Sequence, residues 1–513
     1  CSVFYLIGVI RYLNNMMKKL RLLFVLLWVT SNLFSSPVTG LLERIDKGAS
    51  SKFIIERQKS GTDFFELDQK GDKVIIRGND YVNIATGLNW YLKYYAGIHL
   101  SWNGMTAKLP AVLPPVTKKE RHETDLPYRY DLNYCTFSYS MAFWDWERWE
   151  KEIDWMALHG INLSLALTGT ESVWRNVLLK LGYTKDEINE FVAGPGFTAW
   201  WLMNNLEGWG GPNPESWYIR QEKLQKKIVK RMREYGIEPV LPGYCGMVPH
   251  NAKEKLGLNV ADPGFWCSYH RPAFLQPEDE RFEEISALYY KELTKLYGKT
   301  GFYAIDPFHE GGSTQGVNLD AAGKAIMKAM KKTNPDAVWV AQAWQDNPRT
   351  SMIEHLEAGD LLVLDLHSEC RPQWGDPASE WCRKGGYGQH GWVYCMLLNF
   401  GGNIGLHGKM DALINGFYDA KTDNHAGKTL CGVGMTPEGI ENNPVMYELV
   451  MELPWREHRF TRDEWLKGYV YARYGVEDEA LQQAWDLLGN GIYNSPKEKI
   501  QQGTHESRSE ERR

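Results

Sequence analysis

The sequence predicts an α/β protein: a (β/α)8 barrel of the TIM type, preceded by a small α/β domain and followed by an incomplete all-α domain. Two observations predict the barrel. β-rich runs alternate with amphipathic helices over about 310 residues, and a lone glutamate follows two of those runs, in DPFHE (306–310) and GMTPEG (434–439). Because the C-terminal ends of barrel strands meet on one face, we expect both carboxylates there.

The composition is that of an ordinary globular protein. Of 513 residues, 43% are hydrophobic and 24% charged, and the net charge of −6 gives no reason to expect nucleic acid or an anionic membrane as a partner. The 21 Trp and 27 Tyr are more informative. Aromatic rings stack on sugars, but they also fill large cores, and the counts alone leave both open.

A secretory signal is predicted within residues 1–38. MMKK (16–19) forms a basic region, residues 20–34 are mostly apolar, and SSP (35–37) resembles a cleavage zone, so residues 1–15 are expected to lie upstream of the true start. Arg21, Thr30 and Ser31 interrupt the apolar run, which disfavours a permanent membrane span. We therefore expect an exported protein, periplasmic or secreted, with no stable membrane span after signal removal.

The eight cysteines show neither a C-x-x-C pair nor a zinc-ligand spacing. Several lie inside apolar runs and are expected to be buried. We predict no disulfide framework, no metal and no cofactor.

The first domain is predicted over residues 42–115. Short strands are expected at 52–56 and 73–77, with one amphipathic helix near 80–95. Pro110, Pro114 and Pro115 then mark a linker.

The barrel is predicted over residues 125–455. Helices with apolar residues on one face are expected at 148–158, 217–235 and 282–297, and Gly236 is placed to end the second. Strands are expected at 130–137, 161–167, 237–242, 302–305, 337–343, 361–366, 392–400 and 429–435.

A helical domain is predicted to begin at residue 456 and to run to 513. TRDE (461–464) is a capping box that opens one helix, and a second helix covers 479–488. Two helices offer little surface for a core of their own, and the polar tail from 501 has nothing to bury, so this domain is expected to be incomplete.

Two carboxylates at strand ends suggest glycoside hydrolysis, which needs a proton donor and a group that stabilises the anomeric carbon. Glu310 is the candidate acid/base, and Glu438 the candidate nucleophile, in a turn at 437–439 whose backbone amides are expected to keep it ionised. The 2-acetamido oxygen of an α-linked N-acetylglucosaminide lies on the leaving-group side, so an enzyme for that linkage needs its own nucleophile. Either glutamate alone would more often be a surface or loop-capping residue, and the position of both at predicted strand ends makes the two interpretations about equal.

Ordered blocks of sequence carry a family resemblance that covers residues 128–474. They are WVYCMLLNFGGN (392–403), NYCTFSY (133–139), WDWERW (144–149), EIDWMAL (152–158), GINL (160–163), EINEF (187–191), LP (241–242), PED (277–279) and LLVLDL (361–366). With the two acidic segments, they resemble α-N-acetylglucosaminidases, glycoside hydrolase family 89. Members cleave terminal α-linked N-acetylglucosamine with retention, and the animal lysosomal members act in heparan sulfate breakdown.

The resemblance implies roles for particular residues. It places the acid/base at Glu310, the nucleophile at Glu438, and sugar-contacting positions at Asn133, Cys135, Trp200, Met203, Asn205 and Trp344. Core packing is the alternative for both tryptophans. His309 and His159 stand where animal members have Asn, and either could donate a hydrogen bond near the site.

Asn399 and Asn403 lie in a Gly-rich stretch, where their side chains are candidate amide donors, although Asn-Gly pairs also form turns. The expected partner is an oligosaccharide or glycoconjugate with terminal α-GlcNAc. A retaining glycosidase of other sugar specificity and a non-catalytic glycan-binding protein remain as alternatives. So does a metal-dependent hydrolase that uses Asp306, His309, Glu310, Asp365 and His367.

Overall fold

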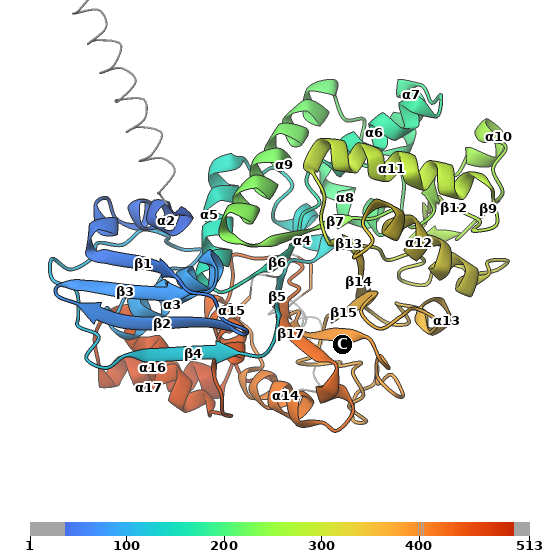
Figure 1. The fold of residues 1–513 in the computed structure, drawn as a ribbon. Coiled ribbons are helices and arrows are strands. Elements are labelled where there is room, and N and C mark those ends of the chain that lie inside the picture. The colour runs from blue at the N-terminus through green and yellow to red at the C-terminus, as the bar shows by residue number, and fades with distance from the viewer. Residues whose placement is uncertain (1–35, 399, 402, 404, 497–513) are drawn as a thin grey trace, which may run out of the picture.

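The computed structural model describes residues 36–398, 400–401, 403 and 405–496, and Figure 1 shows how they are arranged. The predicted secretory signal lies outside the described residues except for its last three. Helix α2 (Pro37–Ile45) begins there, with Ser36 as its N-cap. Among the described residues, no helix has the length and apolar character needed to cross a bilayer.

A four-stranded sheet and one helix form the N-terminal part, in the strand order β1-β3-β2-β4. Helix α3 (Tyr81–Tyr94) packs against β2 and β3. Two strands were not predicted, and β4 lies beyond residue 115. It is polar because it is an edge strand that pairs on one side only, with β2. The elements are η1 (Ala49–Lys52), β1 (Phe53–Arg57), β2 (Asp63–Lys70), β3 (Lys73–Gly78) and β4 (Glu120–Thr124).

Eight parallel strands close into a barrel, which confirms the predicted fold class. The last strand pairs with the first, with Gly432 opposite Tyr128. The strands in chain order are β5 (Tyr128–Asp131), β6 (Leu163–Leu165), β7 (Glu238–Pro242), β13 (Phe302–Ala304), β14 (Val338–Ala343), β15 (Leu361–Asp365), β16 (Gly391–Met396) and β17 (Leu430–Met435).

Several of these strands end one or two residues earlier than predicted, and two end much earlier. β16 ends at Met396 rather than near residue 400. β5 ends at Asp131, and the expected continuation of the strand is instead helix α4 (Tyr134–Tyr139). Asn133 caps this helix by accepting a hydrogen bond from the Cys135 N–H (3.1 Å).

The outer helices follow the predicted pattern. α9 ends at Gly236, whose φ of +97° is readily adopted only by glycine. The helices that alternate with strands are α5 (Trp146–Leu158), α6 (Thr170–Lys180), α9 (Glu215–Tyr235), α11 (Arg281–Tyr297), α12 (Leu319–Thr333), α13 (Thr350–Ile353), α14 (Met410–Thr422), η3 (Ala426–Lys428), α15 (Pro444–Glu452) and η4 (Leu453–Trp455).

Two long loops enlarge the catalytic face, and the sequence patterns did not resolve their small elements. The loop after β6 contains α7 (Lys185–Phe191), η2 (Pro195–Phe197) and α8 (Thr198–Leu202) as well as α6. The loop after β7 contains β8 (Met247–Val248), α10 (Ala252–Leu256), β9 (Val260–Ala261), the hairpin β10 (Phe265–Trp266) and β11 (Tyr269–His270), and β12 (Ala273–Leu275).

The C-terminal helices α16 (Arg462–Tyr474) and α17 (Glu479–Asn490) lie beside the N-terminal sheet in Figure 1, and α16 packs against α3. The predicted capping box is present: Thr461 Oγ1 accepts from the Glu464 N–H (3.2 Å), and the Thr461 N–H donates to Glu464 (2.8 Å).

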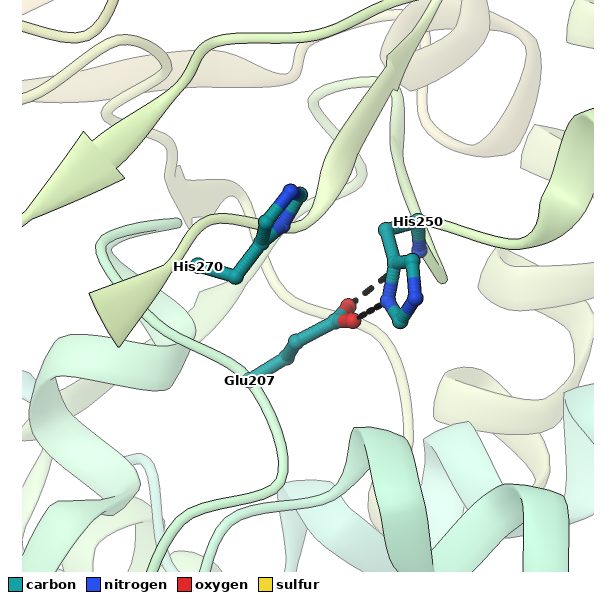
Figure 2. A group of neighbouring side chains, drawn as sticks. All are labelled: Glu207, His250 and His270. Atoms are coloured by element: carbon teal, nitrogen blue, oxygen red, sulfur yellow. Dashed lines mark hydrogen bonds and ion pairs between the residues drawn. The ribbon is translucent and has the colours of Figure 1, made fainter. Parts of the chain in front are cut away.

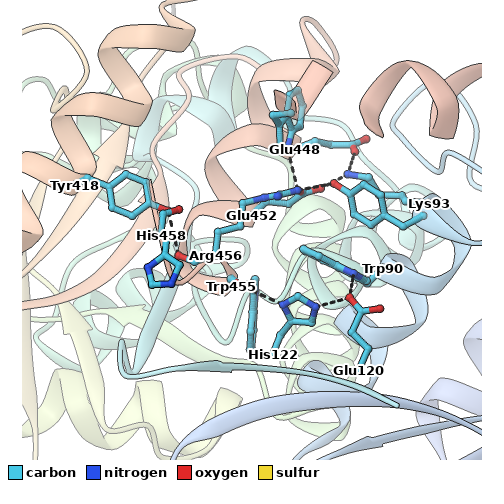
Figure 3. A network of polar contacts seen from close by, with 12 residues as sticks. Trp90, Lys93, Glu120, His122, Tyr418, Glu448, Glu452, Trp455, Arg456 and His458 are labelled. Carbon is cyan, nitrogen blue, oxygen red and sulfur yellow. Dashed lines mark hydrogen bonds and ion pairs between the residues drawn. The ribbon is translucent and has the colours of Figure 1, made fainter. Parts of the chain in front are cut away.

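A buried ion network joins the three parts of the chain (Figure 3). Lys93 of α3 forms ion pairs with Glu448 (2.6 Å) and Glu452 of α15. Glu452 also pairs with Arg456 (2.7 Å) and accepts from Trp465 Nε1 of α16 (2.8 Å). Burial alone would raise the pKa of Glu452, but Lys93 and Arg456 outweigh it and lower the pKa to about 2.

Candidate active site

Glu310 follows β13 on the C-terminal face of the barrel and is half-buried. Its Oε2 accepts a hydrogen bond from Asn205 Nδ2 (3.0 Å), and its Oε1 accepts one from Trp344 Nε1 (3.2 Å). Asn205 lies in the loop after β6 and Trp344 directly follows β14. Donors from two other loops therefore fix both oxygens of this carboxylate.

Arg271, which was not predicted as a site residue, holds both Glu310 and Asn205 in place. Its Nη2 donates to the Glu310 backbone carbonyl (2.8 Å), and its Nη1 donates to Asn205 Oδ1 (2.8 Å). The side chain is fully buried. Its only signal in the sequence is one arginine in a loop, which by itself predicts nothing.

Glu438 follows β17 and is also half-buried. Its Oε2 accepts from the Gly401 N–H (2.5 Å), an amide of the loop after β16 rather than of its own 437–439 turn. Burial, with a smaller contribution from the charge of Glu310, raises the pKa of Glu438 to about 7. The expectation that amides of the 437–439 turn hold this carboxylate is therefore wrong: a single amide of another loop binds it, and burial outweighs that bond in its effect on the pKa.

The two glutamates lie close enough to interact electrostatically, and they do so beside Cys135 and Tyr139. Burial, Glu438 and Glu310, in that order, raise the pKa of the Cys135 thiol. Burial and Glu438, with smaller contributions from Cys135 and Glu310, raise the pKa of Tyr139 to about 12. The structure thus brings Cys135 to the carboxylates and adds Tyr139, which was quoted only within a family block.

Asn133 lies at the end of β5, where both ends of its amide are in use. Besides capping α4, its Nδ2 donates to the Thr436 carbonyl (3.1 Å), and Thr136 Oγ1 of α4 donates to the Pro437 carbonyl. These bonds hold the segment that carries Glu438. In this structure Asn133 therefore positions the candidate nucleophile.

Aromatic rings lie near both carboxylates. Trp200 meets Tyr139 edge-on (centroids 5.3 Å apart) and stacks on Trp266 of β10 (6.1 Å, 22° between planes). Trp344 meets Trp381 (4.8 Å) and Phe400 (5.8 Å) edge-on. Trp200 and Trp344 remain partly exposed. The aromatic density of GFWCSY (264–269) was the available signal for Trp266.

Two substrate positions, Met203 and Asn399, stay predictions. Met203 is 2% exposed and belongs to the hydrophobic core at the end of α8. Asn399 lies outside the described residues.

The two histidines that depart from the family pattern differ in their location. His309 is buried next to Glu310, and burial together with the nearby Arg271 lowers its pKa to about 3, so its ring is neutral. His159 lies at the end of α5, where its Nδ1–H donates to the Trp155 carbonyl (2.8 Å). Because α5 leads into the start of β6, His159 is at the opposite end of the barrel from the carboxylates.

The acidic residues needed by the metal-hydrolase alternative have structural contacts. Asp306 Oδ1 accepts from the Gln342 N–H (2.8 Å) and Asn347 Nδ2 (2.7 Å). Asp365 Oδ2 accepts from two successive backbone N–H groups, of Gln373 (2.9 Å) and Trp374 (2.8 Å). Burial raises the pKa of each aspartate to about 7. Both therefore anchor loops.

A closed parallel barrel with two carboxylates and aromatic rings at its C-terminal face is the architecture of many glycoside hydrolases. Family models of α-N-acetylglucosaminidase match the chain in three consecutive parts: the N-terminal domain at residues 36–115, the TIM-barrel domain at 129–457 and the C-terminal domain at 465–512. The chain belongs to the α-N-acetylglucosaminidase family.

Relatives support this assignment. The chain is 40% identical over 454 residues to human α-N-acetylglucosaminidase, and the match covers 85% of this chain and 60% of the human protein. A family 89 glycoside hydrolase from Clostridium perfringens, solved with 2-acetamido-1,2-dideoxynojirmycin, superimposes with a TM-score of 0.84 at 34% identity. That match covers 91% of this chain and 53% of the clostridial one. The chain thus spans less than two thirds of either relative.

The clostridial protein has also been solved in a form with two glutamates changed to glutamine, in complex with its substrate GlcNAc-alpha-1,4-galactose. A GH20 exo-β-N-acetylglucosaminidase from Vibrio harveyi shares only the fold, with a TM-score of 0.51 at 12% identity.

Proposed function

We propose that this protein is a retaining exo-glycosidase that removes terminal α-linked N-acetylglucosamine from oligosaccharides or glycoconjugates. The observation that carries the proposal is the pair of glutamates at the ends of β13 and β17, near enough for the charge of Glu310 to raise the pKa of Glu438. The substrate bound by the clostridial relative, GlcNAc-alpha-1,4-galactose, supports the choice of sugar and linkage.

In this mechanism the active form carries one proton on Glu310 and a negative charge on Glu438. Glu438 attacks the anomeric carbon while Glu310 protonates the departing oxygen, and a covalent glycosyl-enzyme forms. Glu310, now a carboxylate, then removes a proton from the water that hydrolyses the intermediate. Asn205 and Trp344 stabilise that carboxylate through the two hydrogen bonds described above.

The aromatic rings beside the carboxylates provide surfaces on which a sugar can bind. Sugar rings have apolar faces that stack on partly exposed aromatic side chains. Trp344 binds Glu310 through Nε1, and Trp200 contacts Tyr139, the ring beside both carboxylates. We assign one of Trp200 and Trp344 to the terminal sugar and the other to the aglycone, in either order. Cys135, which lies beside both carboxylates, is the third proposed sugar contact.

We infer export from the leader-like order of a basic region, an apolar run and small residues over 16–37. This inference concerns the location of the protein and is independent of its chemistry.

The test is hydrolysis of p-nitrophenyl α-N-acetylglucosaminide by the parent and by Glu310→Gln and Glu438→Gln. A matched control is Glu457→Gln, because the Glu457 side chain is 87% exposed. Activity in the parent and control with collapse in both site variants supports the proposal. Retention is supported if NMR shows that the α-anomer of N-acetylglucosamine is the first product to appear.

Chemical rescue separates the two roles. With azide, Glu438→Ala should yield the β-glycosyl azide and Glu310→Ala the α-glycosyl azide, because azide replaces the missing group on opposite faces of the sugar. A folded parent that binds N-acetylglucosamine but cleaves no substrate would favour a glycan-binding protein. Cleavage that survives in both glutamine variants and stops with a chelator would favour the metal-dependent alternative.

A further inference from the structure

Three potential metal ligands converge outside the carboxylate pair: Glu207, His250 and His270 (Figure 2). Glu207 lies in the loop between α8 and α9, His250 between β8 and α10, and His270 in β11. One ligand atom from each residue lies within 4.8 Å of the others. Within the described part of the chain, this is the one set of three or more His, Cys, Asp or Glu side chains whose ligand atoms lie this close together.

Backbone contacts fix two of the three residues. The Glu207 N–H donates to the His270 carbonyl (3.2 Å), which joins the two loops directly. His270 Nδ1 lies 2.8 Å from the Arg271 carbonyl. Since a carbonyl can only accept, Nδ1 carries the proton, and the lone pair of the neutral ring is on Nε2. A backbone carbonyl that orients an imidazole in this way is the usual second partner of a metal-bound histidine.

His250 is the adjustable member of the group. Its Nδ1 and its backbone N–H both contact the Glu207 carboxylate, and its side chain is 54% exposed. Glu207, in contrast, has a side chain only 5% exposed. His250 can present Nδ1 to a cation by carrying its proton on Nε2, and it has room to rotate.

We propose that Glu207, His250 and His270 form a binding site for one divalent transition-metal ion, with Zn²⁺ the best match. Two imidazoles and a carboxylate suit Zn²⁺ rather than Ca²⁺ or Mg²⁺, which prefer oxygen ligands. Tetrahedral ligands about 2.1 Å from zinc lie about 3.4 Å apart. His250 Nδ1, which contacts the Glu207 carboxylate directly, must therefore move away from it to make room for the ion, and rotation of the exposed His250 side chain supplies that movement. Solvent occupies the fourth position.

The metal ion fastens loops rather than taking part in chemistry. All three ligands lie in the long loops after β6 and β7, which form one wall of the catalytic face. His270 is next to Arg271, which binds the Glu310 carbonyl and Asn205, and it shares a hairpin with Trp266, which stacks on Trp200. A cation here would hold the support of Glu310 and the aromatic wall in place.

The experiment is a Zn²⁺ titration of the full chain, free of any affinity tag and stripped with a chelator. Binding is followed by competition with a chromophoric chelator, and thermal unfolding is measured with and without Zn²⁺. The parent is compared with His250→Ala, with His270→Ala and with the double variant. His458→Ala is the matched control, because the His458 side chain is 84% exposed and remote from the group in sequence.

The proposal requires one Zn²⁺ per chain, a rise in Tm for the parent and control, and at least about tenfold weaker binding in each single variant. Ca²⁺ and Mg²⁺ should not raise the Tm at the same concentration. Glu207→Gln, which keeps the shape of the side chain, should weaken Zn²⁺ binding without lowering the Tm of the stripped protein. Unchanged affinity in the double variant, or no saturable binding to the parent, overturns the proposal and leaves a hydrogen-bonded His–Glu pair.

Discussion

The guanidinium of Arg271 holds Glu310 in a conformation that residues other than glycine seldom adopt. Glu310 has a φ of +49°, and Arg271 Nη2 donates to its carbonyl oxygen (2.8 Å) while Nη1 binds Asn205, the donor to the Glu310 side chain. A left-handed backbone costs on the order of 1 kcal/mol or more and persists only where other contacts impose it. Arg271 therefore fixes both the backbone and, through Asn205, the carboxylate of the candidate acid/base.

We predict that Arg271→Lys lowers kcat/KM by about 10-fold to 100-fold, because an ammonium cannot span the Glu310 carbonyl and Asn205 at once, and each lost bond to a charged donor is worth about 1.5–3 kcal/mol. The measurement is steady-state kinetics on the aryl glycoside beside thermal unfolding. Arg220→Lys, an exposed substitution, is the control. Activity equal to the parent in a folded Arg271→Lys protein would contradict a positioning role.

Trp344→Phe should keep the aromatic wall and remove the Nε1 donor to Glu310. We expect kcat to fall by about tenfold with little change in KM, since the bond stabilises the Glu310 carboxylate that forms during the reaction. Trp217→Phe offers a comparison: its Nε1 donates to Glu171 (2.9 Å), a carboxylate that has no place in the proposed chemistry. That variant should lose stability and keep its activity. A change in KM alone for Trp344→Phe would instead indicate a stacking role.

The barrel was predictable because its signals are local. Most strands are short apolar runs, and helices such as α9 carry a regular apolar stripe that ends at glycine. The two catalytic candidates were also within reach, since strand order places any residue after β13 and β17 on one face.

The supporting residues were not predictable from local pattern, because long-range packing creates them. Four residues that follow barrel strands adopt a positive φ although none of them is a residue type that favours turns: Leu132, Phe308, Gln345 and Leu398. Arg271 and Asn205 meet Glu310 from separate loops, at sequence distances of 39 and 105 residues. In the same way, no spacing motif signals the Glu207, His250 and His270 group.

The pH profile should report Glu438. A pKa of about 7 means that the nucleophile is protonated, and inactive, below neutrality. For an aryl substrate whose good leaving group needs no acid, kcat/KM should rise with pH up to about 7 and then level off. Glu310→Gln removes the neighbouring negative charge, which lowers the pKa of Glu438, so this limb should move to lower pH. A limb that stays in place would argue against electrostatic contact between the two carboxylates.

Gly401 gives a steric test of the same carboxylate. A Cβ atom at this position would lie 2.5 Å from the Tyr139 hydroxyl, so Gly401→Ala must displace either the tyrosine or the amide that donates to Glu438. We expect a clear loss of kcat in this variant. Combining it with Tyr139→Ala, which removes both the hydroxyl and the ring carbon Cζ that would lie 2.6 Å from the new Cβ, should restore part of the rate relative to Tyr139→Ala alone. No rescue would show that the backbone moves rather than the ring.

The ion network between the three parts of the chain should control stability in acid. Glu452 has a lowered pKa of about 2, so its pairing stabilises the folded protein fully above its ordinary pKa of about 4.5 and is lost as the pH falls toward 2. Each such group adds a slope of up to about 1.4 kcal/mol per pH unit in that window.

Glu452→Gln should remove the part of the slope that Glu452 contributes. At neutral pH it should lower the free energy of unfolding by about 3–5 kcal/mol, because it leaves the buried Lys93 with one carboxylate fewer and breaks the Arg456 pair. Denaturant unfolding at several pH values measures both effects. Glu477→Gln, an exposed change near the same helices, should alter neither. An undiminished slope in Glu452→Gln would contradict this role for Glu452. The acid sensitivity would then come from another carboxylate, with Glu448, the second partner of Lys93, as the first candidate.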